Sequence, residues 1–189
     1  SRCSYCSFIS QAVSNPEDPL IAAYLEALLI EVKGALNWLK ARQWHMDTLY
    51  IGGGTPSVFS AAQIRELMET LSEHWTLDTL GEITFEAGRP DTITEEKLKV
   101  LKDYPVNRIS INPQTLQPKT LERINRCHTV ESFYEAWRLA ECMGFETMNL
   151  DLILGLPGEG KADLKSTLQA IEPLNAANVT IHALALKRS

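Results

Sequence analysis

The sequence predicts an α/β fold, a partial (βα)6-type TIM-like barrel of parallel strands. Three observations predict it. Short apolar, β-prone runs alternate with longer segments whose apolar residues recur at helical spacing. Glycine or proline follows most of the short runs. Small or polar residues gather at the same points. Strand–helix alternation of this kind favours a parallel sheet with right-handed crossovers.

The elements follow in order. A helix is expected over residues 18–42, where Asp18 is placed to cap it and Pro19 fits its first turn. A strand over 48–51 stops at a glycine-rich turn, and Ser60 then caps a helix over 61–74. The remaining predicted strands are 82–86, 108–111, 147–154 and 178–186. The remaining predicted helices are 94–102, a short one after Pro118, 130–143 and 160–172.

Two architectures fit this order, an open doubly wound sheet and a barrel. The turn at residues 52–56 lacks the third glycine of a dinucleotide fingerprint at the needed offset, which favours the barrel. The strands are nearly continuous apolar runs, so we expect both faces to be covered and the barrel to be lined by apolar strands. The first barrel strand is expected to precede residue 1.

Composition excludes some functions. The chain has 189 residues, 44% of them hydrophobic, and a formal net charge of -6. An acidic chain is a poor partner for duplex nucleic acid, so we expect none. No apolar run is long enough for a membrane span. The four cysteines do not form the dense pattern of a secreted disulfide scaffold, which favours a reducing, cytoplasmic setting.

Polar or small residues follow successive strands, at the edge where parallel α/β proteins place their ligands. They are the turn 52–56, Glu86 with Arg89, Gln114, Asp151, and Ala185 with Lys187 and Arg188. Each has a structural alternative: a tight loop, an ion pair between Glu86 and Arg89, or a cap formed by Asp151. Because four successive strand ends offer such groups, we expect a ligand site at this edge.

Cys3 and Cys6 have the spacing of two ligands in one metal centre. Three interpretations compete. A thioredoxin-like dithiol would open a helix after a strand, whereas this pair precedes a loop rich in Ser, Asn and Pro. A zinc site would need a second pair of ligands. An iron–sulfur site could use these two thiolates with one more cysteine before residue 1.

The motifs together resemble the radical S-adenosylmethionine (SAM) superfamily, and within it the oxygen-independent coproporphyrinogen III oxidase family with its less characterised paralogues. They are Cys3-Ser4-Tyr5-Cys6, Gly52-Gly53-Gly54-Thr55-Pro56, Glu86 with Pro90, and the run from Asp151 to Gly158. The family pattern is C-x-x-x-C-x-x-C, whose first cysteine would fall two positions before Ser1. The resemblance implies that residues 1–189 are a radical SAM core domain, a fragment of a longer protein. The family's fourth nearby cysteine is replaced by Phe8, as in the paralogues.

The resemblance implies that Cys3 and Cys6 bind a [4Fe–4S] cluster. It implies cofactor-binding roles for Tyr5, Gly53, Gly54, Thr55, Glu86, Gln114, Arg126, Asp151 and Ala185. Among these, Tyr5 packs beside the adenine, Glu86 is an acidic partner of SAM, and Arg126 binds a carboxylate. The family usually has Gly-Val-Gln where this chain has Asn112-Pro113-Gln114.

The implied reaction begins when an electron donor reduces the cluster, which cleaves SAM to methionine and a 5′-deoxyadenosyl radical. In the oxidase, the radical leads to oxidative decarboxylation of coproporphyrinogen III propionates to vinyl groups, a step of haem biosynthesis. The implied partners are therefore a porphyrinogen substrate and an electron donor. Two alternatives remain open, a haem-binding chaperone of the same family and a radical SAM enzyme with another substrate.

Overall fold

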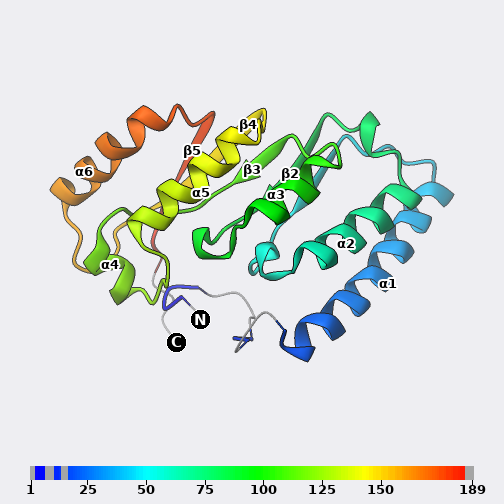
Figure 1. The fold of residues 1–189 in the computed structure, drawn as a ribbon, viewed down its shortest axis with the longest axis horizontal. Coiled ribbons are helices and arrows are strands. Elements are labelled where there is room, and N and C mark those ends of the chain that lie inside the picture. The colour runs from blue at the N-terminus through cyan, green and yellow to red at the C-terminus, as the bar shows by residue number, and fades with distance from the viewer. Residues whose placement is uncertain (1–2, 7–10, 14–16, 186–189) are drawn as a thin grey trace.

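A computed structural model describes residues 3–6, 11–13 and 17–185 of the chain. Figure 1 labels the elements along the chain. The helices are α1 (Pro19–Ala41), α2 (Ala61–His74), α3 (Glu95–Lys102), α4 (Pro118–Arg123), α5 (Val130–Cys142) and α6 (Lys161–Ile171). The strands are β1 (Thr48–Ile51), β2 (Glu82–Glu86), β3 (Arg108–Ser110), β4 (Thr147–Leu154) and β5 (Asn178–Ala183).

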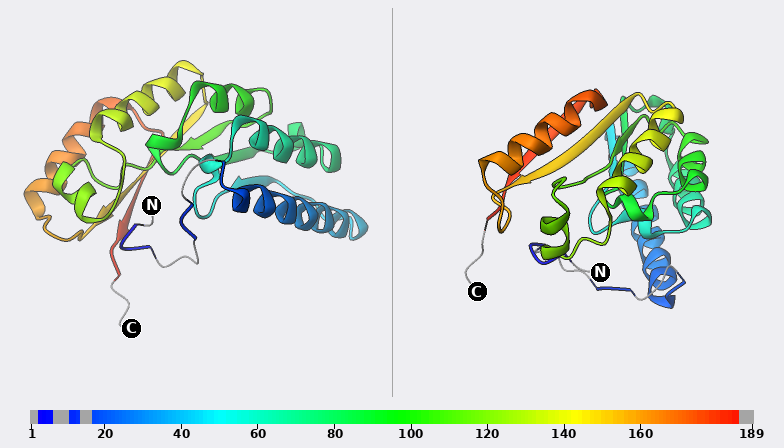
Figure 2. Two further views of the ribbon diagram at one scale, coloured as in Figure 1. Left: turned by 60° about the horizontal axis from the view of Figure 1, so that its bottom comes forward. Right: turned by 60° about the vertical axis from the view of Figure 1, so that its left-hand side comes forward.

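The described strands form a 5-stranded sheet in the order β1-β2-β3-β4-β5. Every neighbouring pair is parallel. The sheet curves into an arch with helices along its convex side, and the cysteine loop lies below it beside α4 (Figures 1 and 2). The predicted α/β class and parallel strand order are therefore confirmed. Within the described residues, β1 and β5 are the two edges of the sheet.

Local sequence explains the helix starts. The Asp18 side chain accepts from the Leu20 amide at 3.0 Å. The side chains of Ser60 and Gln63 form a reciprocal capping box at the start of α2. Thr94 and Thr129 cap α3 and α5 in the same way as Ser60, by accepting from a backbone amide three residues on. These caps place the predicted starts of α2, α3 and α5 within one residue of the observed ones.

One face of the sheet is apolar and packs on the helices. Ile83, Ile109 and Leu150 from three neighbouring strands are 0% exposed, as are Ile64 and Met68 on α2. They belong to one core cluster that extends from α1 to α6. This packing fixes the strand register, because a slip by one residue would turn every apolar side chain to the other face.

The other face is polar, so the expectation that apolar side chains line the barrel is wrong, whereas the curved parallel sheet agrees with the predicted partial TIM-like barrel (Figure 1). The register aligns Glu86, Ser110, Asn149 and Asn178 in one row across four strands. Neighbouring rows are hydrogen-bonded across the strands. Arg108 donates to Glu82 Oε2 at 3.1 Å and to Asn149 Oδ1 at 3.3 Å. The last strand also ends at Ala183 and not at the predicted residue 186, which lies outside the described residues.

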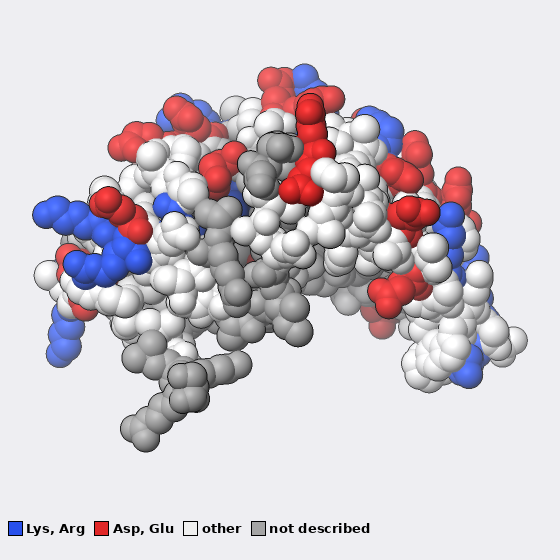
Figure 3. All heavy atoms as spheres, turned by 90° about the horizontal axis from the view of Figure 1, so that it is seen from below, with Lys and Arg blue, Asp and Glu red and all other residues white. Residues whose placement is uncertain are grey.

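In the view from below, most of the visible charged side chains lie along the convex, helical rim (Figure 3). Within the residues that the structure describes, none of the helices has both the length and the hydropathy that crossing a membrane requires.

Candidate functional site

The glycine-rich turn after β1 is held by Glu86 at the end of β2. Glu86 Oε2 accepts from the Gly53 amide at 3.1 Å and from the Tyr50 hydroxyl at 3.3 Å. A Cβ atom on Gly52 would lie 2.0 Å from the Tyr50 ring and 2.7 Å from Glu86 Oε2, so a side chain here would displace both of these groups. Burial, followed by the Glu86 charge, raises the pKa of Tyr50 to about 12. Gly53 has a φ of 120°, which also favours glycine.

Gln114, after β3, is held in a left-handed conformation with a φ of 66°. Its amide donates to the Asp151 carbonyl at 3.0 Å, and its own carbonyl accepts from the Ile153 amide at 2.8 Å. Its side-chain Oε1 is buried without a hydrogen-bond partner. A strained backbone that carries an unpaired buried acceptor is typical of a binding site.

Asp151 lies at the centre of the polar face. Its Oδ1 accepts from Asn149 Nδ2 at 3.1 Å, and its amide donates to Asn112 Oδ1 at 3.1 Å. Its Oδ2 lies 3.7 Å from His182 Nε2 on β5. The carboxylate that the sequence placed inside an apolar run is thus paired, and it stands on the polar side of β4.

Arg126 connects two strand-end loops and the cysteine loop, and it is only 8% exposed. Its Nη2 donates to the Gly88 carbonyl at 3.1 Å and to the Asn112 carbonyl at 2.5 Å. Its Nη1 lies 3.9 Å from Cys3 Sγ. Its Nε is buried without a partner. The side chain therefore joins the ends of β2 and β3 to the cysteine loop.

The cysteine loop, residues 3–6, packs beside Arg126 and Ile124. The Cys6 amide donates to the Cys3 carbonyl at 3.2 Å, and the Ser4 amide donates to the Ile124 carbonyl at 3.0 Å. Cys3 is 8% exposed, and its Sγ accepts from Arg89 Nη2 at 3.4 Å. Tyr5 packs against a small apolar cluster that includes Ile124. Burial raises the pKa of Tyr5, against the opposing charge of Arg126.

Contacts therefore connect most of the predicted site residues. Arg126 contacts both Cys3 Sγ and the Asn112 carbonyl. The Asn112 side chain accepts from the Asp151 amide, and the Asp151 carbonyl accepts from the Gln114 amide. Gly88 places Glu86 in the same region, because a Cβ atom there would meet both Glu86 Oε1 and Asn112 Nδ2 within 4 Å.

Three predicted residues lie beside this network. Gly54 has open space around it, the Thr55 hydroxyl donates to the Gly54 carbonyl, and Ala185 is exposed after β5. Phe8, Lys187 and Arg188, on which the sequence analysis also drew, lie outside the described residues.

Sequence analysis missed Tyr50, Asn112, Asn149 and His128. The signal for Asn112 and Asn149 was their period-two spacing with Ser110 and Asp151, which indicates one face of a strand. His128 is buried, both of its ring nitrogens lack a well-formed hydrogen bond, and its pKa is lowered to about 4, first by burial and then by Arg126.

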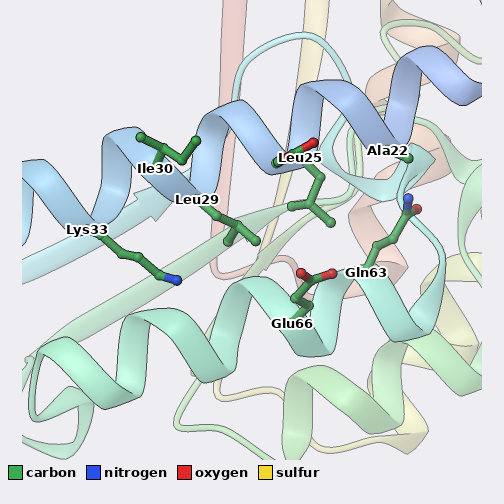
Figure 4. A pocket seen from close by; sticks show the side chains of 8 residues that line it. Ala22, Leu25, Leu29, Ile30, Lys33, Gln63 and Glu66 are labelled. Carbon is green, nitrogen blue, oxygen red and sulfur yellow. The ribbon is translucent and has the colours of Figure 1, made fainter.

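A groove of about 490 Å³ lies elsewhere, between α1 and α2 (Figure 4). Leu25 and Leu29 line it, together with the charged side chains of Glu26, Lys33 and Glu66. It is on the outer, helical side of the sheet, so it is separate from the site at the strand ends.

Fold and site together define a class of protein: a parallel α/β protein that holds a cysteine pair, arginines and carboxylates at the carboxyl ends of its strands. A family model described as the radical SAM superfamily matches residues 1–171. The chain therefore belongs to the radical SAM superfamily, and its similarity is to the HemN-like proteins within it.

Three comparisons give the extent of that similarity. The chain is 40% identical to the oxygen-independent coproporphyrinogen-III oxidase-like protein HemZ of Bacillus subtilis, over 100% of this chain and 38% of HemZ. It is 36% identical to the heme chaperone HemW of Lactococcus lactis, over 98% of this chain and 46% of HemW. It matches the structure of Escherichia coli coproporphyrinogen III oxidase (HemN), described as a radical SAM enzyme, with a TM-score of 0.87 and 27% identity, over 98% of this chain and 42% of HemN. The chain thus spans less than half the length of these relatives.

The family implies a [4Fe–4S] cluster and SAM, and the residues present fit SAM and two of the three cysteine ligands of the family's cluster pattern. Within the described residues, no group of three or more His, Cys, Asp and Glu side chains could hold a metal ion, so Cys3 and Cys6 offer two thiolate ligands only. Buried Arg126 Nε and Gln114 Oε1 have unused hydrogen-bonding capacity. Glu86 and Asp151 are carboxylates suited to a cationic ligand.

Proposed function

We propose that this protein binds a [4Fe–4S] cluster through Cys3 and Cys6 and binds SAM at the adjoining strand ends. The cluster, once reduced by an electron donor, supplies the electron that cleaves SAM and yields a 5′-deoxyadenosyl radical. The observation that carries the proposal is the position of Arg126, which links Cys3 Sγ to the carbonyls of Gly88 and Asn112. That link brings the thiolates to the edge of the sheet where the polar groups gather.

Each site residue has a role in this proposal. Glu86 holds the glycine turn by its backbone and offers a carboxylate to the cationic end of SAM. Arg126 Nε is a buried donor for the SAM carboxylate, and Gln114 Oε1 is a buried acceptor for a hydroxyl or amine. Asp151 accepts from a ribose hydroxyl. Tyr5, Gly53, Gly54, Thr55 and Ala185 form the walls, where small residues allow close approach.

For the substrate, we propose first coproporphyrinogen III, whose propionates would lose carbon dioxide to become vinyl groups. The structural likeness to HemN, a coproporphyrinogen III oxidase, supports this assignment. The polar inner face of the sheet also suits a substrate with carboxylate and pyrrole N–H groups.

The second candidate is a haem-binding chaperone. Several relatives that align with nearly the whole chain are described as heme chaperone HemW. Phe8 replaces the fourth cysteine, which is the feature that the sequence shares with paralogues of the oxidase. As a chaperone, the protein would keep its cluster and SAM sites, and it would bind and deliver its tetrapyrrole ligand without changing it chemically.

The test begins with the cluster. The intact protein, reconstituted anaerobically with iron and sulfide, should show iron–sulfur absorbance and release 5′-deoxyadenosine from SAM when reduced. Cys3→Ser and Cys6→Ser should lose both signals, whereas the exposed cysteines give matched controls, Cys127→Ser and Cys142→Ser, that keep them. A cluster that survives loss of both Cys3 and Cys6 would overturn the proposal.

A second measurement separates the two candidates. Anaerobic turnover with coproporphyrinogen III should give a vinyl product if the protein is an oxidase. Stable haem binding by a protein that cleaves SAM but leaves coproporphyrinogen III unchanged would assign the chaperone role.

A further inference from the structure

We propose that Arg89 is a positioning residue that places a second positive charge against Cys3 and thereby raises the reduction potential of the cluster bound there. The inference rests on the proposed function, because it concerns the same cluster. Arg89 is expected to act on the electron-transfer step through Cys3, and it needs no contact with SAM.

The geometry that carries the proposal is the surroundings of one sulfur atom. Arg89 Nη2 lies 3.4 Å from Cys3 Sγ, and Arg126 Nη1 lies 3.9 Å from it. Cys3 is buried. Two guanidinium groups therefore lie beside one shielded sulfur, where charge acts more strongly than in water.

The backbone of Arg89 is held by the turn that follows it. Its carbonyl accepts from the Thr92 amide at 3.0 Å and from the Thr92 hydroxyl at 2.8 Å. Pro90, next in the chain, is buried and opens a 3-10 turn. Lys97 Nζ donates to the Thr92 carbonyl at 2.9 Å and to the Ser57 carbonyl at 2.8 Å, which anchors that turn to the loop after β1. The guanidinium thus projects from a rigid base.

The sequence also allows an ion pair between Arg89 and Glu86, as a structural feature of the rim. In the structure, Glu86 Oε2 is occupied by the Gly53 amide and the Tyr50 hydroxyl. Arg126 differs from Arg89, because its Nη2 supports two backbone carbonyls and its loss would disturb the loops themselves. At Arg89, comparison of the Gln and Lys variants separates the effect of charge from any loss of structure.

Reduction adds one electron to the cluster and so adds one negative charge next to the thiolates. Hydrogen bonds to the sulfurs and nearby positive charge stabilise that reduced form and raise the potential. A charged donor gives a stronger hydrogen bond than a neutral one. Removing the charge of Arg89 should therefore make the cluster harder to reduce, while its iron content stays unchanged.

The experiment is a redox titration of the reconstituted intact protein, followed by the electron paramagnetic resonance of the reduced cluster. Arg89→Gln should make reduction about tenfold less favourable, which is about 59 mV for a one-electron couple. Arg89→Lys should restore most of the wild-type potential because it keeps the charge. Arg65→Gln is the matched control, since Arg65 pairs with Asp103 at 2.7 Å on the outer surface and should leave the potential unchanged.

Each outcome decides the matter. Equal potentials in wild type and Arg89→Gln, with equal iron content, would overturn the proposal and leave the proposed function intact. A lowered potential in both Arg89 variants, or failure of both to take up the cluster, would also overturn it, because Lys keeps the charge. A wild-type protein that takes up no cluster would refute the proposed function itself.

Discussion

Gln114 gives the most informative prediction, because the structure implies that it reduces stability in order to serve the site. Its left-handed φ of 66° costs about 1–2 kcal/mol for a non-glycine residue. Its buried, unpaired Oε1 costs about 1–3 kcal/mol more. Gln114→Gly removes both costs. Two effects of the substitution destabilise the fold. The flexibility of glycine costs about 0.5–1 kcal/mol, and each of the two lost methylene groups costs about 0.8 kcal/mol.

The midpoints of these ranges leave a net stabilisation of about 1 kcal/mol, which for a chain of this size raises Tm by about 2–4 °C. Urea unfolding of the cluster-free protein measures it. The same variant should bind SAM about 3–10-fold more weakly, because the ligand loses one hydrogen bond. Stability and binding should thus change in opposite directions.

Gln43→Gly is the control. Gln43 also has a left-handed φ, of 54°, but it is exposed and lies between α1 and β1, before the end of β1 that is opposite the glycine turn. It should gain a few tenths of a kcal/mol from relief of strain, with unchanged SAM affinity. A Gln114→Gly protein that is less stable than wild type by about 1 kcal/mol or more would refute the reasoning on strain. Unchanged SAM affinity would refute the assignment of Gln114 to the site.

Three further predictions concern the turn, the buried histidine and the core. Gly52→Ala should displace Glu86 and weaken SAM binding about tenfold or more, whereas Gly34→Ala, in α1 with open space around it, should not; equal affinities of the two variants by calorimetry would contradict this. In the folded protein His128 stays neutral, because its pKa is lowered to about 4. In the unfolded chain the same histidine takes up a proton near pH 6.5. The free energy of unfolding is therefore highest above pH 7 and falls by up to about 3 kcal/mol as the pH drops from 6.5 to 4. His128→Gln should flatten that slope in urea titrations at several pH values. Met68→Ala, at a position that is 0% exposed, should cost about 2–5 kcal/mol in the same assay, and a cost below 1 kcal/mol would contradict its place in the core.

The sequence predicted those features that local chemistry determines. Ser60 and Thr94 begin helices because their hydroxyls accept from backbone amides three residues on, and such signals lie within a few residues of each other. The glycine turn was visible for the same reason, since Gly53 and its neighbours interrupt an apolar run. The strand order followed from the alternation of elements.

The polar inner face of the sheet was not predicted, because a long run of mostly apolar residues hides a period of two within it. In β4, Asn149 and Asp151 alternate with Met148, Leu150 and Leu152, which is the pattern of a strand with one polar face. Arg126 illustrates a different limit. Its partners at Gly88 and Asn112 come from two other loops, and no local pattern encodes which carbonyls a distant arginine will meet.

The charges of the site are separated in space, and this separation bears on what it can select. Arg89 and Arg126 lie at the sulfur of Cys3, whereas Glu86 and Asp151 lie at the ends of β2 and along β4. A ligand that carries only negative charge would gain at the arginines and lose at the carboxylates, and a purely cationic ligand would do the reverse. A ligand with a carboxylate at one end and cationic groups beside it gains at both, which is the charge pattern of SAM. Selectivity would then arise from the repulsion of singly charged competitors as much as from attraction.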